Sequence, residues 1–394
     1  MWGPGRRSTC AAWPRAAACS EGRGVAAGLP PGSGAGHREL MTPLPVFDGH
    51  NDVLLRLREL GRPDGGVRAF LEGGAGGHLD LPRAREGGLF GGLFAAFTPS
   101  RQLGVDYLAL MRAAQYDVPT PEPLPLAEAQ AATLAMAAIL LRIERASEGA
   151  VATCRSVADI RRAKEAGSLA AVLHIEGAEA IGPDLDALHM LYAAGLRSLG
   201  PVWSRPNVFG YGAPFRFPSS PDIGPGLSQA GRDLVAECDA LRIVLDLSHL
   251  NEAGFWDVAR LSRAPLVATH SNAHALTPHA RNLTDRQLDA IRDTGGLVGL
   301  NFATCFLRED GRMRADTPLE TMARHLDHLI GRLGVDHVGF GSDFDGAVVP
   351  FELHDVAGLP RLIEALRQYG FDQETLEKLA WRNWLGVLER IWGG

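Results

Sequence analysis

From Val46 onward, short apolar segments alternate with longer segments whose apolar residues recur at helical spacing. Several short segments, such as residues 243–247, are apolar on both faces, which is typical of buried parallel strands. Eight such strands, most followed by a helix, predict an α/β fold, a (β/α)8 TIM-type barrel. An open doubly wound sheet would favour a glycine-rich phosphate loop where the sequence has His50-Asn51-Asp52. The predicted strands lie near residues 46–49, 89–97, 170–175, 196–202, 243–248, 265–269, 296–303 and 337–342.

Several predicted helices have recognisable capping residues, and one long segment between a strand and a helix has no regular pattern. Ser228 and Thr284 stand where N-caps are expected, and Gly295 and Gly334 stand where helices should end. Residues 203–226 are rich in Pro and Gly and follow a strand, so we expect a long loop that forms a wall or lid of the active site. The predicted helices span residues 124–149, 228–241, 251–262, 284–294, 317–333, 355–368 and 372–392.

The first forty residues differ from the rest of the chain. They are rich in Gly, Ala, Pro and Arg, and no apolar stretch of signal-peptide length follows Arg6 and Arg7. We expect residues 1–40 to be a disordered tail or, alternatively, a mis-assigned start that precedes a natural initiator at Met41. Residues 41–394 are then expected to form one (β/α)8 domain.

Bulk properties exclude several classes of partner and site. The net charge of −7 and the lack of a basic run argue against nucleic acid, because phosphate binding needs positive charge. The five cysteines include no Cys-x-x-Cys pair, so a structural zinc knuckle is unsupported and a reducing, cytoplasmic location is expected. We find no window of about 20 apolar residues, so we expect a soluble protein with no membrane partner.

Polar residues interrupt the ends of five predicted strands, and these ends are the most informative feature of the sequence. In a (β/α)8 barrel the carboxyl ends of the strands converge on one mouth, so residues far apart in the chain can meet there. The five interruptions read Asp48-Gly49-His50-Asn51-Asp52, His174-Ile175-Glu176-Gly177, Asp246-Leu247-Ser248-His249, Thr269-His270-Ser271 and Gly341-Ser342-Asp343-Phe344-Asp345-Gly346.

Five of these residues predict a metal site. His50 and Asp52 are two apart and point to the same side of a strand, although such a pair alone could be a hydrogen-bonded core feature. A carboxylate buried at the end of an apolar strand, as Glu176 would be, is costly unless it is paired or binds a metal. His249 and His270 end consecutive strands. Imidazole and carboxylate ligands without thiolate suit zinc or manganese.

The number of candidate ligands favours two metal ions. Five ligands are too many for one catalytic zinc with an open position, and they suit two ions that share the Glu176 carboxylate. His50 and Asp52 would complete one ion, and His249 and His270 the other. A hydroxide between two such ions would be a strong nucleophile near neutral pH.

Further residues extend the candidate site. Asp343 ends the eighth strand, beside the first strand in a closed barrel, and is the candidate general acid/base, with a sixth metal ligand or a turn aspartate as alternatives. Arg281 and Asn282 follow the His270 strand, and an arginine suits the capture of a substrate carboxylate. From spacing alone, we favour the alternative that Arg281 is a solvent-facing loop residue.

The combined pattern resembles the bacterial branch of the membrane (renal) dipeptidase family, zinc metallopeptidases with an amidohydrolase-type barrel. The resemblance covers roughly residues 44–390 with every motif in order. It implies two Zn²⁺ per subunit on the five ligands, with Glu176 bridging, and it implies that Asp343 is the acid/base and that Arg281 binds the substrate carboxylate. It also implies hydrolysis of dipeptides, often with a D-residue at the C-terminal position, and a homodimer.

One segment departs from the family pattern. Animal members carry Leu-Thr-His after the fourth strand, whereas Trp203 stands at the position of that histidine here. Stabilisation of the oxyanion would then come from the metals, from Arg281, or from Arg205 or Asn207 in the following loop. Losing one such donor in other enzymes costs about 100- to 1000-fold in rate.

We therefore expect a binuclear zinc dipeptidase. A second hypothesis keeps the two metals but changes the substrate to another amide or a lactone, such as a cyclic amide or an N-acyl amino acid, because of Trp203. A third is a non-catalytic metal-binding scaffold, which would predict a missing ligand or acid/base. No position of the set is missing.

Overall fold

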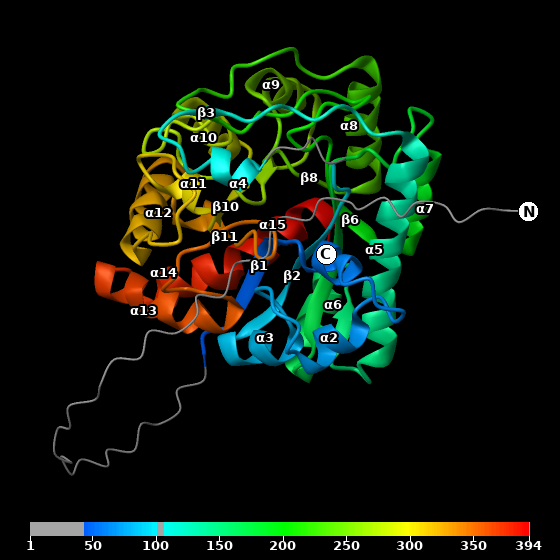
Figure 1. The fold of residues 1–394 in the computed structure, drawn as a ribbon, viewed down its shortest axis with the longest axis vertical. Coiled ribbons are helices and arrows are strands. Elements are labelled where there is room, and N and C mark those ends of the chain that lie inside the picture. Colours follow the sequence, from blue (N-terminus) through cyan, green and yellow to red (C-terminus); the bar gives the residue numbers. More distant parts are fainter. Residues whose placement is uncertain (1–42, 101–105, 394) are drawn as a thin grey trace, which may run out of the picture.

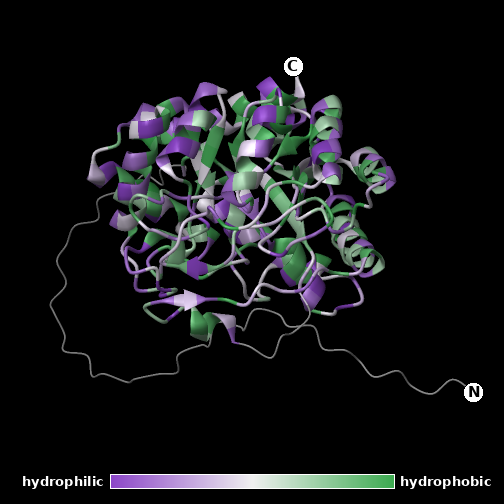
Figure 2. Cartoon of the chain, turned by 90° about the horizontal axis from the view of Figure 1, so that it is seen from above, coloured by the Kyte–Doolittle hydropathy of each residue, from purple (hydrophilic) through white to green (hydrophobic). Residues whose placement is uncertain are grey.

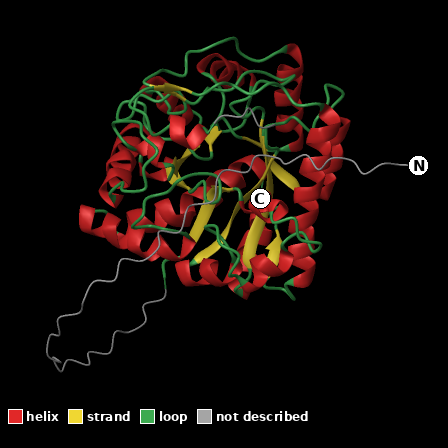
Figure 3. Cartoon of the chain, in the orientation of Figure 1, coloured by secondary structure: helices red, strands yellow, loops and turns green. Residues whose placement is uncertain are grey.

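The structure is a computed structural model of the chain and describes residues 43–100 and 106–393. The predicted tail, residues 1–40, lies outside the described residues. Within them, strands alternate with helices along the chain, and the helices surround a central sheet (Figure 1, Figure 3). The apolar residues gather on the strands and on the inner helix faces, while hydrophilic residues colour the outer helix faces (Figure 2).

The central sheet is the predicted barrel. In the described part of the chain, eight parallel strands run in the order β8-β6-β5-β2-β1-β11-β10-β9. A parallel bridge between Asp246 and Val267 joins the two ends of this series and closes it, with Leu247 N donating to Val267 O at 2.9 Å. All eight predicted strands are confirmed: β1 (Val46–Asn51), β2 (Leu89–Phe97), β5 (Leu169–Glu176), β6 (Leu196–Gly200), β8 (Val244–Leu245), β9 (Val267–Ala268), β10 (Leu297–Asn301) and β11 (Val338–Gly341).

The end of the barrel opposite the strand-end residues is filled by Trp384, which belongs to α15 (Asn383–Trp392). Its indole Nε1 donates to Phe340 O at 2.8 Å, and the side chain is fully buried. A Cβ at Gly49 or Gly339 would meet this indole at 2.2 or 2.6 Å, so only glycine fits there. The barrel is therefore a packed core that can open only at the carboxyl ends of its strands.

The predicted helix signals are confirmed at their ends. Ser228 accepts a hydrogen bond from Gly231 N, Thr284 forms a capping box, and Gly334 follows the last residue of α12. The last predicted helix, residues 372–392, is interrupted by a π-helical segment over Lys378–Arg382. The helices are α1 (Val53–Glu59), α2 (Val67–Glu72), α3 (Leu81–Gly87), α4 (Tyr107–Leu110), α5 (Leu126–Ala146), α6 (Val157–Ala166), α7 (Asp186–Ala194), α8 (Gln229–Leu241), α9 (Glu252–Leu261), α10 (Asp285–Asp293), α11 (Thr304–Leu307), α12 (Leu319–Leu333), α13 (Leu359–Tyr369), α14 (Gln373–Glu377) and α15.

Helix α5 corrects one expectation. We expected no segment with the length and composition of a membrane span. Among the described residues, α5 is one helix that has both. Its Ala/Leu-rich sequence raises the mean hydropathy, but one face, including Met136, Leu140 and Ile143, is buried in the protein. A core helix with such a face passes the same test, so α5 is weak evidence for a membrane span.

The predicted long loop lies between β6 and α8. Its one regular element is β7 (Arg216–Phe217), which pairs antiparallel with β3 (Tyr116–Asp117) to form a two-stranded ribbon apart from the barrel. A further short strand, β4 (Val151–Thr153), pairs with β5. The sequence signals did not include these three short strands, because two or three residues are too few to show a period.

Candidate metal centre and substrate pocket

The five predicted metal ligands meet at the carboxyl ends of four barrel strands. His50 lies in β1 and Asp52 directly follows it, Glu176 ends β5, and the two remaining histidines follow β8 and β9. All five are at most 5% exposed, although they are polar. Burial of this many polar side chains at one point is costly unless they share a partner. The residues are His50, Asp52, Glu176, His249 and His270.

Glu176 lies at the centre of the set. Its Oε1 is 2.7 Å from His249 Nε2, 3.4 Å from His270 Nε2 and 3.6 Å from His50 Nε2. The same His50 Nε2 is 3.5 Å from Asp52 Oδ2. Among the described residues, three groups have ligand atoms within 4.8 Å of one another and could each hold an ion. Two of them divide the predicted ligands, Glu176–His249–His270 and His50–Asp52–Asp343, and the third is His50–Asp246–His270.

The donor atoms fit metal ions better than they fit one another. Both ring nitrogens of His50 and Oδ1 of Asp52 are buried without a hydrogen-bond partner, and His249 Nε2 lies 3.1 Å from His270 Nε2. Unpartnered buried atoms of this kind are rare and costly in folded proteins. Divalent ions would bind these lone pairs, and imidazole with carboxylate is a donor set that zinc accepts.

The electrostatics of the site favour a cation. Burial lowers the pKa of His249 and of His270 well below the ordinary value, which leaves the neutral imidazoles that metals require. Burial also lowers the pKa of His50, but the carboxylates of Glu176 and Asp52 outweigh it and raise it to about 10. The carboxylates therefore favour a positive charge at this point, which a divalent ion would supply in place of the proton of His50.

Hydroxyl groups hold two of the imidazole rings from behind. Thr269 Oγ1 lies 2.8 Å from His270 Nδ1 and donates to Asp246 Oδ2 at 2.6 Å. Ser204 Oγ lies 3.2 Å from His249 Nδ1. Contacts of this type fix the tautomer and the direction of a metal-binding histidine, so that Nε2 faces the ion. The sequence analysis did not identify Ser204 as a partner of His249, or Asp246 as the acceptor that holds Thr269.

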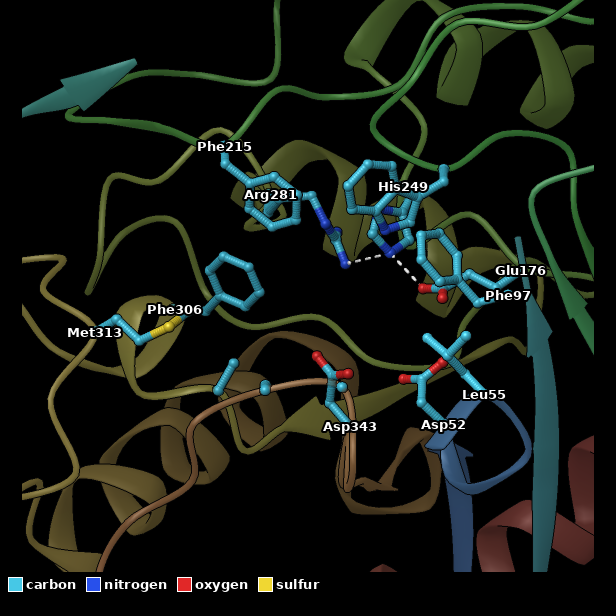
Figure 4. A pocket seen from close by; sticks show the side chains of 14 residues that line it. Asp52, Leu55, Phe97, Glu176, Phe215, His249, Arg281, Phe306, Met313 and Asp343 are labelled. Atoms are coloured by element: carbon cyan, nitrogen blue, oxygen red, sulfur yellow. Dashed lines mark hydrogen bonds and ion pairs between the residues drawn. The ribbon is translucent and has the colours of Figure 1, made fainter. Parts of the chain in front are cut away.

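Asp343 lies two residues after the end of β11, beside Asp52 in the pocket (Figure 4). Its backbone has φ of 58° and its N donates to His50 O at 3.0 Å, which ties the acid/base candidate to the ligand strand. Burial, and then the charge of Asp52, raise the pKa of Asp343 to about 6, which suits proton transfer near neutral pH.

Asn301 holds the Asp343 carboxylate, with Nδ2 donating to Oδ2 at 2.9 Å. Sequence reasoning missed this residue. The signal was available, because Asn301 ends β10 and is a polar strand end like the other five. Its amide fixes one carboxylate oxygen of Asp343.

Arg281 is buried and lines the pocket, so it is not a solvent-facing loop residue. Its Nη1 donates to Ser248 O, its Nη2 lies 3.3 Å from His249 Nε2, and its Nε has no hydrogen-bond partner. Figure 4 shows the guanidinium pointing toward His249 and Glu176. Burial lowers the pKa of Arg281 to about 10, so it remains a cation at neutral pH.

The pocket beside these residues has about 470 Å³ of empty space, including the solvent at its open mouth (Figure 4). One wall is polar and the other is largely aromatic. Trp203 belongs to the aromatic wall, with its ring 5.0 Å from that of Phe97 and 5.9 Å from that of His249. The lining residues are Asp52, Leu55, Phe97, Glu176, Trp203, Phe215, His249, Arg281, Ala303, Phe306, Met313, Asp343, Gly346 and Ala347.

Two predicted substrate-binding residues are not among these lining residues. Asn207 Nδ2 donates to Pro201 O at 2.9 Å and its Oδ1 accepts from Phe209 N at 2.8 Å, so its amide is used within the loop. Asn282 Nδ2 donates to Thr277 O and to Phe306 O, both at 2.9 Å, and holds neighbouring backbone.

Arg205 also lies outside the lining, although its loop neighbour Trp203 is part of it. Its guanidinium is fully buried and pairs with Glu179 at 2.9 Å. Further hydrogen bonds run to Ser100 Oγ and Thr98 O. Its guanidinium carbon also lies 5.9 Å from the ring of Phe97 and 5.7 Å from that of Trp203. Because its donors are used on these partners and it is absent from the lining, Arg205 ties loops together behind the aromatic wall and is not placed to bind an oxyanion.

Comparisons with known proteins identify relatives of this arrangement. The family model of membrane dipeptidase, peptidase family M19, matches residues 35–392. The solved structure of dipeptidase AC, an M19 metallopeptidase, is 58% identical with a TM-score of 0.86 and covers 89% of this chain and 99% of its own. A metallopeptidase from Rhodobacter sphaeroides, liganded with a phosphinate mimic of the dipeptide L-Ala-D-Ala, has the same identity and TM-score, over 89% of this chain and all of its own. Dipeptidase ataJ of Aspergillus terreus is 30% identical over 379 residues, 90% of this chain and 86% of that protein.

Proposed function

The chain belongs to the membrane dipeptidase family and is a metal-dependent peptide hydrolase, and we propose that it hydrolyses dipeptides with two zinc ions. The observation that carries the proposal is the position of Arg281 in the same pocket as the Glu176-centred ligand set. A buried cation beside a metal centre suits a small substrate that ends in a carboxylate close to the bond to be cleaved.

The ligands divide around Glu176. His249 and His270 would hold one ion and His50 and Asp52 the other, with the Glu176 carboxylate between them. Zinc is supported by a donor set of imidazole and carboxylate without thiolate. Bound divalent ions would polarise the scissile carbonyl and lower the pKa of a water so that it can attack at neutral pH.

The side chains of the chain supply binding and proton transfer. Arg281 would bind the substrate carboxylate and fix the dipeptide in one direction. The Asp343 carboxylate, held by Asn301 at 2.9 Å, would accept a proton from the attacking water and return it to the leaving amine. The aromatic wall, with Phe97, Trp203 and Phe306, would exclude bulk water from the reacting groups.

We propose that substrates with a D-residue at the C-terminal position are included. This is supported by the Rhodobacter sphaeroides relative, which is 58% identical and is liganded with a phosphinate mimic of L-Ala-D-Ala. The proposed substrate therefore has two residues and a free carboxylate, and its side chains are not specified.

A dipeptide panel on metal-quantified protein tests this function. Free amino acids should appear from L,L- or L,D-dipeptides, activity should be lost on chelation, and zinc should restore it at about two ions per chain. No hydrolysis across the panel with two metals bound would contradict the proposal. If Arg281→Ala left kcat/KM unaltered, another amide or a lactone would become the better substrate class.

We also propose a cytoplasmic location and a homodimer. The location is supported by the described cysteines, Cys154, Cys238 and Cys305, which are buried free thiols. The dimer is supported by the family resemblance. Cell fractionation and light scattering of the purified chain test the two statements, and a membrane-bound or monomeric protein would contradict them.

A further inference from the structure

His279 is a fully buried imidazole that the proposed reaction does not use. It stands two residues before Arg281, and its Nδ1 accepts a hydrogen bond from Arg281 N at 3.0 Å. A neutral histidine has one donor and one acceptor nitrogen, so this bond places the proton on Nε2. That Nε2 has no hydrogen-bond partner. The ring is therefore held in one tautomer by a single contact, and that contact is with Arg281.

Aromatic rings surround this imidazole. The ring of Phe306 lies 4.7 Å away at 66°, and that of Phe217 lies 6.4 Å away and nearly parallel, at 24°. Tyr116 and Phe215 lie at 5.8 and 6.4 Å. Burial lowers the pKa of His279 well below its ordinary value, so the ring stays neutral and Nδ1 stays an acceptor. Three of the rings come from β3, β7 and α11, and Phe215 directly precedes β7, so segments far apart in the chain pack against the imidazole.

The same surroundings hold Arg281. Its guanidinium lies over the ring of Phe306, 5.4 Å from the centroid, so Phe306 contacts both His279 and Arg281. Ala280 N, between the two residues, donates to Arg216 O of the ribbon at 3.2 Å. The ribbon thus holds this short segment through the backbone, and His279 is the side chain that fixes the backbone of Arg281 itself.

We propose that His279 is a positioning residue for Arg281 and that, through it, His279 sets the affinity of the enzyme for the carboxylate of its substrate. This inference rests on the proposed function, in which Arg281 binds that carboxylate. His279 is absent from the pocket lining, so it acts without touching the substrate. Its role follows from geometry, because a charged group displaced by about 1 Å can lose on the order of 100-fold in rate.

Two substitutions separate the acceptor atom from the volume of the ring. His279→Asn keeps an acceptor, since Oδ1 of Asn bonds the backbone N two residues on, as Nδ1 of His279 does. His279→Phe fills the aromatic surroundings but has no acceptor. His279→Leu serves the same purpose if the phenylalanine variant does not fold. His189→Phe, on an exposed position of α7, is the matched control.

The measurement is the affinity for the phosphinate mimic of L-Ala-D-Ala and for its C-terminal amide, by calorimetry, together with KM and kcat for a dipeptide. His279→Phe should weaken binding of the carboxylate form by about tenfold, with a much smaller effect on the amide, and should raise KM more than it lowers kcat. His279→Asn should recover most of this loss, and His189→Phe should show none of it. Metal content and thermal unfolding verify that each variant is folded.

The outcomes separate this inference from the proposed function. Arg281→Met must weaken binding of the carboxylate form more than that of the amide; if both change equally, the proposed function fails. If Arg281→Met discriminates but His279→Phe and His279→Leu do not, the positioning role is overturned while the function stands. An equal loss of kcat on all substrates with unchanged KM, or a failure of Asn to rescue, would also overturn it.

Discussion

The pocket has a polar wall around Glu176 and an aromatic wall around Trp203, and the two differ in how their buried polar atoms are satisfied. Asp52 in the polar wall and His50 next to it, outside the lining, keep buried atoms without hydrogen-bond partners. Behind the aromatic wall, Arg205 uses its guanidinium on Glu179 and two further oxygens.

Two kinds of buried polar cluster can be distinguished by the partners of their atoms. An unpartnered cluster of ligand-type atoms calls for a partner from outside the chain, here metal ions. A paired cluster is a structural tie, whose loss affects folding before it affects chemistry. One oxygen, Oε2 of Glu179, is unpartnered in the second cluster, but within residues 43–100 and 106–393 Glu179 belongs to no group of potential metal ligands.

The largest effect is expected when Glu176 of the ligand set and Glu179 of the ion pair are each replaced by glutamine. Glu176→Gln should lower kcat/KM by at least about 1000-fold, because metal ions contribute several kcal/mol to the transition state. Glu179→Gln should keep the metals and lower stability instead. Metal analysis, initial rates and urea unfolding separate the two. If Glu176→Gln retained full metal and rate, the polar wall would not be a metal site.

A second prediction concerns Asp343 within the polar wall. Asp343→Asn should lower kcat by about 100- to 10,000-fold while both metals stay bound, because general acid–base catalysis contributes this much. Asn301→Ala, which frees one oxygen of the same carboxylate, should give a smaller loss in the same direction. Rates on metal-quantified protein test this. Loss of one metal in Asp343→Asn would instead make Asp343 a sixth ligand.

A third prediction concerns the aromatic side. Arg205→Met leaves the Glu179 carboxylate buried without its cation and should lower the free energy of unfolding by about 3–5 kcal/mol. Adding Glu179→Leu removes the second charge and should recover most of that loss. Urea unfolding of the single and double variants gives the comparison. Equal instability in both would show that packing, and not the ion pair, holds the loops.

The smallest effect is expected for Trp203 itself. Trp203→Phe keeps an apolar ring beside Phe97 and should change KM by only a few-fold, whereas Trp203→Ala removes the ring and should raise KM by about tenfold. Metal content should be unchanged in both. Steady-state kinetics on one dipeptide are sufficient. A loss of about 100-fold in kcat with Trp203→Phe would mean that the indole takes part in the chemistry.

Several parts of the fold and the site could be predicted from the sequence because their signals are local. An apolar run marks each strand wherever it packs, and Ser228 and Thr284 cap their helices through neighbouring backbone. His50 and Glu176 were identifiable because a polar residue at the carboxyl end of a barrel strand lies at the mouth where all these strand ends converge. Asn301 carried the same signal and could have been found.

Other parts were decided by the tertiary structure alone. Spacing could not show whether Arg281 faces solvent or the pocket, because its burial depends on Phe306 and on the ribbon, which come from distant segments. The aromatic residues of the pocket have the same sequence signature as core residues, so Phe97 could not be told from its neighbours in β2.

The sequence also could not show that Arg205 and Asn207 lie outside the pocket lining. Arg205 and Asn207 share one loop with Trp203, yet only Trp203 lines the pocket. A loop has no period that fixes which side chain points inward, and their directions follow from partners such as Glu179 and Pro201. The sequence therefore determined which residues are candidate metal ligands, and the packing of distant segments determined which residues line the pocket.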